Sequence, residues 1–145
     1  MNRIPNYRVW HKIEKRFVDL RSIDFEQDSI GYDCQGEANY YDVAKFDEIV
    51  FQQSTGLKDK NGKEIFEGDI VNVKRSFTRP YIKDGKIDYK TIDGELETGQ
   101  VIWWELQASF LVEYKGYDEY GDLLCSSVGC EVVGNVFENN ELLKK

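Results

Sequence analysis

Apolar and polar residues alternate in short runs along most of the chain, which is the pattern of half-buried β-strands. Residues 7–10 and 16–20 are two such runs, and the polar residues 11–15 between them have the length of a hairpin connection. Residues 99–104 and 109–114 form a second pair, with Phe110, Val112 and Tyr114 on one face. The pattern therefore predicts a mainly β protein that opens with a hairpin.

The pattern is weaker between these two pairs. Residues 22–42 are rich in Asp, Ser, Gly and Asn, so we expect irregular connections with at most one further strand. Residues 44–53 are typical of one extended strand, which Thr55-Gly56 is expected to end.

Turn residues dominate the segment from residue 54 to residue 73. Asn61-Gly62 is the pair that best supplies two consecutive positive φ angles, so a type I′ hairpin turn is predicted there. Residues 67–69 predict a tight corner, in which Asp69 accepts backbone N–H groups and Glu67 is solvated. Residues 70–73 then alternate as a strand should.

The C-terminal half contains one long excursion and a short ending. Residues 74–98 hold an Asp-Gly turn between β-capable arms, which predicts an exposed hairpin or a long loop. In the last strand, residues 130–137, Gly134 indicates a bulge. Asn139 is expected to cap one helical turn over residues 139–143. Short strands with small connections favour a compact β-barrel.

Several of these segments together resemble the YopX-like family of phage and prophage proteins. The matching blocks are Tyr7-Arg-Val-Trp10, Thr55-Gly-Leu-Lys-Asp-Lys-Asn-Gly-Lys-Glu-Ile-Phe-Glu-Gly-Asp-Ile-Val71, Gly99-Gln-Val and Glu131-Val-Val-Gly-Asn-Val-Phe-Glu-Asn139. The resemblance spans nearly the whole chain and implies an SH3-type β-barrel in its central and C-terminal parts. We therefore expect a single domain over residues 1–145, with a small β-rich N-terminal lobe at 1–48 and an SH3-like barrel at 49–145 from which residues 74–98 extend.

Charge and cysteine usage narrow the classes of function. The formal net charge is −8, which disfavours nucleic acid as a partner because an acidic surface repels phosphate. The odd count of three cysteines fits a reducing compartment. No apolar run approaches the roughly 20 residues that span a bilayer. We expect a cytoplasmic protein without a membrane anchor.

The residues that could carry chemistry all have a simpler structural interpretation. The single histidine, His11, lies in a charged turn and is expected at the surface. Cys34, Cys125 and Cys130 lack the paired spacing of zinc ligands. Glu67 and Asp69 organise a corner. We therefore predict no catalytic residue, metal site or cofactor, and a protein that is not an enzyme.

Two sets of residues remain as candidates for binding. Alternation sends either Trp103 or Trp104 to the outer face of the sheet, where an exposed aromatic side chain is a typical protein-binding anchor. The candidate protein-interaction residues, with packing against the N-terminal lobe as the alternative interpretation, are Trp103, Trp104, Tyr117 and Tyr120. The candidate nucleic-acid contacts, with solubilising charge as the alternative interpretation, are Lys58, Lys60, Lys63, Lys74, Arg75 and Arg79.

The favoured function is that of a phage or prophage accessory protein in the cytoplasm of the bacterial host. It would act on a protein partner or as a homo-oligomer, because the aromatic content exceeds what one small barrel requires. A nucleic-acid-binding SH3-like module is the first alternative. An acidic decoy that mimics DNA is the second, and it follows from the net charge.

Overall fold

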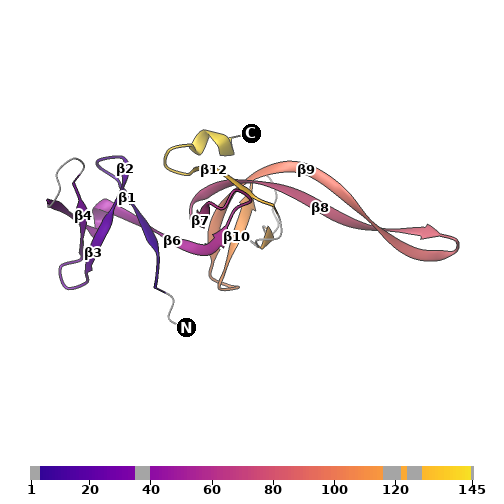
Figure 1. Cartoon of the computed structure of the whole chain (residues 1–145), viewed down its shortest axis with the longest axis horizontal. Coiled ribbons are helices and arrows are strands. Elements are labelled where there is room, and N and C mark those ends of the chain that lie inside the picture. Colours follow the sequence, from indigo (N-terminus) through magenta and orange to yellow (C-terminus); the bar gives the residue numbers. More distant parts are fainter. Residues whose placement is uncertain (1–3, 35–39, 116–121, 124–128, 145) are drawn as a thin grey trace. The chain divides into compact units, whose positions relative to one another are not determined.

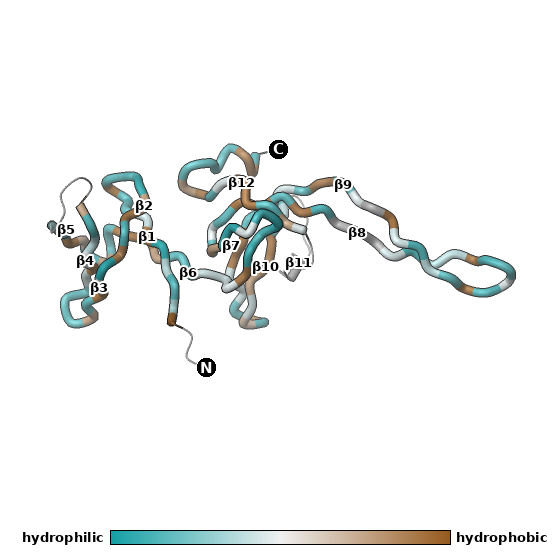
Figure 2. Tube along the Cα trace, viewed as in Figure 1, coloured by the Kyte–Doolittle hydropathy of each residue, from teal (hydrophilic) through white to brown (hydrophobic). Residues whose placement is uncertain are grey.

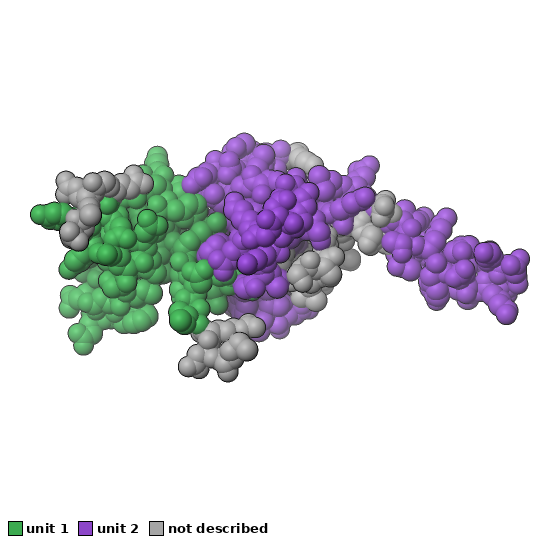
Figure 3. Space-filling view, viewed as in Figure 1, with its two compact units in different colours: residues 1–55 green, residues 56–145 purple. Residues whose placement is uncertain are grey.

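The computed structural model describes residues 4–34, 40–115, 122–123 and 129–144, without the side chains of residues 75–77, 93, 122 and 123. The chain divides into two compact units, Met1–Thr55 and Gly56–Lys145, which Figure 3 shows in different colours. Strand β6, Ile49–Lys58, runs from the first unit into the second.

The first unit begins with the hairpin that the sequence predicts. Strand β1, Tyr7–His11, lies between β2, Arg16–Val18, and β6, and is antiparallel to both. Lys15 adopts a positive φ of 53° and closes the connection between β1 and β2. The predicted opening hairpin is confirmed.

A second, three-stranded antiparallel sheet follows in the first unit. It contains β3, Leu20–Asp24, β4, Ser29–Asp33, and β5, Tyr41–Lys45, in that spatial order. The prediction of at most one strand here was wrong. The central strand is buried along its first four residues and does not alternate, while the two edge strands are largely exposed, so neither shows the expected period.

The core of the first unit lies among these strands. Its buried members are Val9, Val18, Ile30, Tyr32, Ala44 and Ile49. A short 3₁₀ helix, η1, Phe46–Glu48, separates β5 from β6, so residues 44–53 are not one strand as predicted. Thr55-Gly56 does not end β6 either, because Gly56 takes a φ of 75° within a continuing strand.

The second unit is built on a five-stranded antiparallel sheet that curls into a half-barrel (Figure 1). Its strands in spatial order are β11, Asp122–Leu123; β10, Ser109–Tyr114; β9, Lys86–Trp104; β8, Asp69–Lys83; and β12, Glu131–Asn135. A short strand β7, Glu64–Phe66, pairs with β6. The mainly β class is confirmed, and so is the hairpin across residues 105–108.

A cluster of buried side chains forms the hydrophobic core of the second unit. Its members are Ile65, Val71, Val73, Val101, Val112, Tyr114 and Cys130. Leu57, Phe110 and Val132 pack against this cluster and are partly buried. None of these residues lies in the outer parts of β8 and β9, residues 74–98.

The turn at Asn61-Gly62 differs from the prediction. Only Gly62 has a positive φ, of 82°, so the type I′ assignment was wrong. Instead the buried Asp59 accepts the backbone N–H groups of Asn61 and Lys63 at 2.9 Å and that of Val132 at 3.0 Å. One carboxylate therefore organises the whole connection and ties it to β12.

The corner at residues 67–69 is confirmed. Gly68 has a φ of 83°, which an L side chain rarely adopts, and the backbone N–H of Phe66 donates to Asp69 Oδ2 at 2.9 Å.

The predictions for the C-terminal residues are confirmed in part. The ladder between β12 and β8 shifts register between Val132 and Gly134, which is the predicted bulge. The helical turn is present as η3, Asn140–Leu143. Its predicted capping was wrong, because Asn139 Oδ1 accepts the backbone N–H of Asn135 at 3.2 Å instead.

Candidate interaction surfaces

Strands β8 and β9 continue beyond the half-barrel as a two-stranded hairpin, which we call the arm and define as residues 74–98. The ladder is paired out to Lys83 opposite Lys86. Asp84 and Gly85, with φ angles of 51° and 73°, form the two-residue turn that a type I′ hairpin requires. Figure 1 shows the arm extending away from the other strands of its unit. The sequence prediction of an exposed hairpin is confirmed.

One face of the outer arm is apolar and uncharged. The register places Thr78 opposite Thr91, Pro80 opposite Tyr89 and Ile82 opposite Ile87, and paired residues share a face. We call these six positions the apolar face. Ile82, Ile87 and Tyr89 are 78%, 70% and 64% exposed. Figure 2 shows the outer arm as mainly hydrophilic, with short hydrophobic segments near its tip.

The opposite face of the outer arm is basic. It pairs Arg79 with Lys90, Tyr81 with Asp88, and Lys83 with Lys86, and we call these six positions the basic face. The Tyr81 hydroxyl donates to Asp88 Oδ2 at 3.0 Å, and Lys90 Nζ lies 5.9 Å from the centroid of the Tyr81 ring. Two pairs of like charges therefore stand directly opposite each other, which destabilises an isolated ladder.

The structure describes two of the four aromatic candidates from the sequence. Trp103 is the outward one of the two tryptophans, at 43% exposed, and its ring packs edge-on against Phe110 at 4.9 Å. Trp104 is half-buried. Tyr117 and Tyr120 lie outside the described residues.

The cationic candidates are distributed over two places. Lys58 ends β6, and Lys60 and Lys63 belong to the connection that Asp59 organises, where Lys60 Nζ lies 3.1 Å from Glu131 Oε2. Lys74 stands at the inner end of the arm and Arg79 on its basic face, while the side chain of Arg75 lies outside the described part.

Sequence reasoning missed the other three cations of the basic face, Lys83, Lys86 and Lys90. Their register follows from the Asp84-Gly85 turn, because a two-residue loop fixes which residues face each other. Counting outward from that turn would have grouped them with Arg79.

Asp59 has a distinctive electrostatic environment. Burial favours the neutral acid and would raise its pKa, but the backbone N–H groups of Val132, Lys63 and Asn61 and the charge of Lys63 outweigh this effect. The pKa of Asp59 is therefore lowered from its ordinary value of 3.8. All of its partners belong to the turn or to β12, so the group has a structural role.

His11 is not at the surface as predicted. It is 5% exposed at the end of β1, where its Nδ1 accepts the backbone N–H of Glu14 at 3.2 Å and its ring contacts that of Tyr32. The prediction was wrong because the strand continues to His11 and turns the ring inward, opposite Ile49.

The side chains around His11 bind one another. The Tyr32 hydroxyl donates to Glu14 Oε1 at 2.9 Å, and Arg16 Nη2 lies 2.7 Å from Glu14 Oε2. Burial, the hydrogen bond to Glu14 and the nearby acidic charges raise the pKa of Tyr32 to about 12. A phenol held neutral in this way links β4 to the β1–β2 connection.

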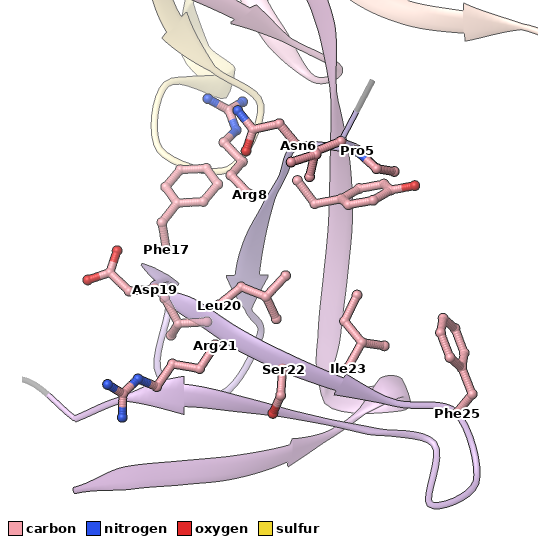
Figure 4. Close-up of a pocket in the computed structure, with 13 residues that line it drawn as sticks. Pro5, Asn6, Arg8, Phe17, Asp19, Leu20, Arg21, Ser22, Ile23 and Phe25 are labelled. Atoms are coloured by element: carbon pink, nitrogen blue, oxygen red, sulfur yellow. The ribbon is translucent and has the colours of Figure 1, made fainter. Parts of the chain in front are cut away.

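The first unit also contains an open groove of about 910 Å³, lined by residues 4–8 and 17–23 and by Phe25 (Figure 4). Its two arginines have partners: Arg8 Nε donates to Gln52 Oε1 at 2.7 Å and the guanidinium stacks over Phe17, while Arg21 pairs with Asp33. Both cationic side chains of the groove therefore already have partners, and most of its remaining lining residues are apolar.

The described residues hold no group of three or more His, Cys, Asp or Glu arranged to bind a metal ion. Within that same part of the chain, Cys34 is half-buried and Cys130 is buried, both as free thiols, whereas Cys125 lies outside it. In the described ranges no helix has the length and apolar character needed to cross a membrane.

The model of the YopX protein family matches residues 6–144, nearly the whole chain. The chain belongs to the YopX family. A solved structure with the same fold is the crystal structure of protein EF1440 from Enterococcus faecalis, at 26% sequence identity and a TM-score of 0.60. That alignment covers 99% of this YopX chain and 100% of the other. No curated protein matches the chain.

Proposed function

We propose that this YopX-family chain is a phage or prophage accessory protein that acts in the cytoplasm of the bacterial host by binding protein through its arm, and not by catalysis. The partner we infer is a second copy of the same chain. The half-barrel from which the arm extends is proposed to be of the SH3 type. The observation that carries the proposal is the exposed apolar face.

An exposed apolar face on a two-stranded ladder is unfavourable without a partner. Isolated hairpins are marginally stable in water, and they become stable when a face is packed. Ile82, Ile87 and Tyr89 together place three large apolar side chains in solvent on one side of the arm. Burying them would stabilise the arm and remove this surface from water.

The charge pattern favours a second copy as the occupant. The apolar face has no charged residue among its six positions, so two such faces can pack together without desolvating a charge. The basic faces would then point away from each other on the outside. A contact between two identical patches closes as a twofold dimer and does not propagate into a fibre.

The size of the face sets the expected affinity. It exposes on the order of a few hundred Å² per copy, whereas a stable interface buries roughly 800 Å² per partner. We therefore expect a weak dimer that forms as the protein concentration rises.

Analytical ultracentrifugation from micromolar to millimolar concentration tests the proposal. The wild type should shift from monomer to dimer, and the double variant Ile82→Ser with Ile87→Ser should stay monomeric. The matched control is Ile13→Ser with Leu106→Ser, because these side chains are 68% and 87% exposed outside the arm. The control should dimerise as the wild type does.

A wild type that remains monomeric throughout this range would contradict self-association. Dimerisation that persists in the Ile82→Ser, Ile87→Ser variant would contradict an interface on the apolar face of the arm. Amide exchange across β8 and β9 should show that the variant arm still pairs, so that loss of the dimer is not loss of the hairpin.

A further inference from the structure

The four cations of the basic face are not explained by the apolar contact proposed above. Arg79 stands directly opposite Lys90, and Lys83 directly opposite Lys86, so the ladder brings like charges together twice. Asp88 is the one acid on this face, and its carboxylate accepts hydrogen bonds from the Tyr81 hydroxyl and the backbone N–H of Tyr89. The basic face therefore has a net charge of +3.

We propose that the basic face binds the phosphodiester backbone of duplex DNA, with Arg79, Lys83, Lys86 and Lys90 contacting phosphates. A polyanion would relieve the repulsion within both cationic pairs. This site rests on the opposite face of the arm and is independent of the self-association proposed above.

The geometry of the arm fits a duplex. A two-stranded β-ribbon is an element that the major groove admits. The two cationic pairs are four residues apart along the strands, roughly 13 Å at 3.3 Å per residue, so they reach different phosphates. Tyr81 lies between the pairs and adds an aromatic surface beside them.

The acidic net charge of the chain does not oppose DNA binding at the end of the arm, which lies far from the half-barrel. Residues 78–91 carry four basic and two acidic side chains, a net charge of +2, although the whole chain carries −8. From Lys74 to Lys83 the strand spans roughly 30 Å, whereas the Debye length at physiological salt is about 8 Å. The half-barrel's acidic groups are therefore screened from a ligand at the end of the arm.

Fluorescence anisotropy with a short labelled duplex of random sequence tests this inference between about 50 and 200 mM salt. Four phosphate contacts predict a slope of about −3.6 for log K against log salt. The double variant Lys83→Gln with Lys86→Gln should halve this slope and weaken binding roughly tenfold to a hundredfold at the lower salt.

Matched variants separate a site on the arm from a general effect of charge. Lys15→Gln with Lys144→Gln changes the net charge equally outside the arm and should bind as the wild type does. Lys83→Arg with Lys86→Arg keeps the charges and should retain the slope. Ile82→Ser with Ile87→Ser should also retain it, whatever happens to self-association.

Three results would overturn the inference. The first is an equal loss of affinity in the Lys15, Lys144 control, which would assign binding to overall charge. The second is a slope that the Lys83, Lys86 variant leaves unchanged. The third is tighter binding to a single strand of the same length than to the duplex, which would overturn the assignment to duplex DNA.

Discussion

Strands β8 and β9 pass through two environments along one continuous ladder. Near the half-barrel, Val71, Val73 and Val101 are buried in the core. Farther along the same strands, Ile82 and Ile87 face each other in solvent. Alternation determines which side chains share a face of a sheet, but the neighbouring elements decide whether that face is covered. The inner part of the ladder contributes to folding and the outer part is available for binding.

The turns of the packed region and of the outer arm are also held by different interactions. The connection at residues 59–63 depends on the buried Asp59 carboxylate and its three backbone donors. The turn at the end of the arm depends on two residues with positive φ, Asp84 and Gly85. The first turn is therefore part of the packed body, by which we mean the second unit without its arm, whereas the second is determined by local conformation.

The largest expected effect comes from deleting apolar side chains in the two regions. Ile65→Ala should lower the free energy of unfolding by about 2–5 kcal/mol, because Ile65 is 1% exposed and its loss leaves a cavity. Ile82→Ala should change it by less than about 0.5 kcal/mol in the monomer. Urea denaturation of both variants at low protein concentration measures the difference, and equal losses would show that the arm is packed on the body.

The next largest expected effect on stability is that of Asp59→Ala. It leaves three backbone N–H groups without their acceptor and should cost about 1–3 kcal/mol, measured by urea denaturation. Asp88→Ala on the exposed arm is the matched control and should leave the midpoint within about 0.5 kcal/mol of the wild type. An Asp59→Ala variant whose free energy of unfolding equals that of the wild type would contradict the role assigned to this carboxylate.

The lowered pKa of Asp59 gives this prediction a pH dependence. A carboxyl group whose pKa is lower in the folded state stabilises the fold at pH values above its unfolded pKa of 3.8. That contribution decreases as the pH falls through 3.8 and then through the folded value. The difference in stability between wild type and Asp59→Ala should therefore shrink below about pH 4, and a difference that stays constant down to pH 2 would contradict it.

The sequence predicted the features that local chemistry decides. The Gly68 corner, the Gly134 bulge, the opening hairpin and the exposed arm each follow from turn residues or period-two alternation. The sheet β3-β4-β5 was missed because its central strand is buried on both sides and its edges are exposed. Such strands do not show the alternation on which the prediction depended.

Specific side-chain contacts account for the other differences. Asp59 replaces the predicted type I′ turn by reaching Val132, which lies 73 residues away in the chain. Asn139 is drawn from its predicted cap to the backbone of Asn135. The two faces of the arm required only the register of one turn, so that part of the candidate site was predictable from the sequence although Lys83, Lys86 and Lys90 were not selected.

The smallest effect separates the two turns by location. Gly62→Ala and Gly85→Ala each place a side chain on a residue with φ above 70°, at a cost of about 1 kcal/mol. Neither added Cβ would meet another atom within 4 Å, so the cost is conformational. Gly62→Ala should lower the unfolding midpoint of the body. Gly85→Ala should leave that midpoint unchanged and speed amide exchange in residues 78–91, because only the arm depends on its turn. Urea denaturation measures the midpoints, and hydrogen exchange followed by mass spectrometry measures the exchange rates. A lowered midpoint in Gly85→Ala would show that the arm and the half-barrel unfold as one cooperative unit.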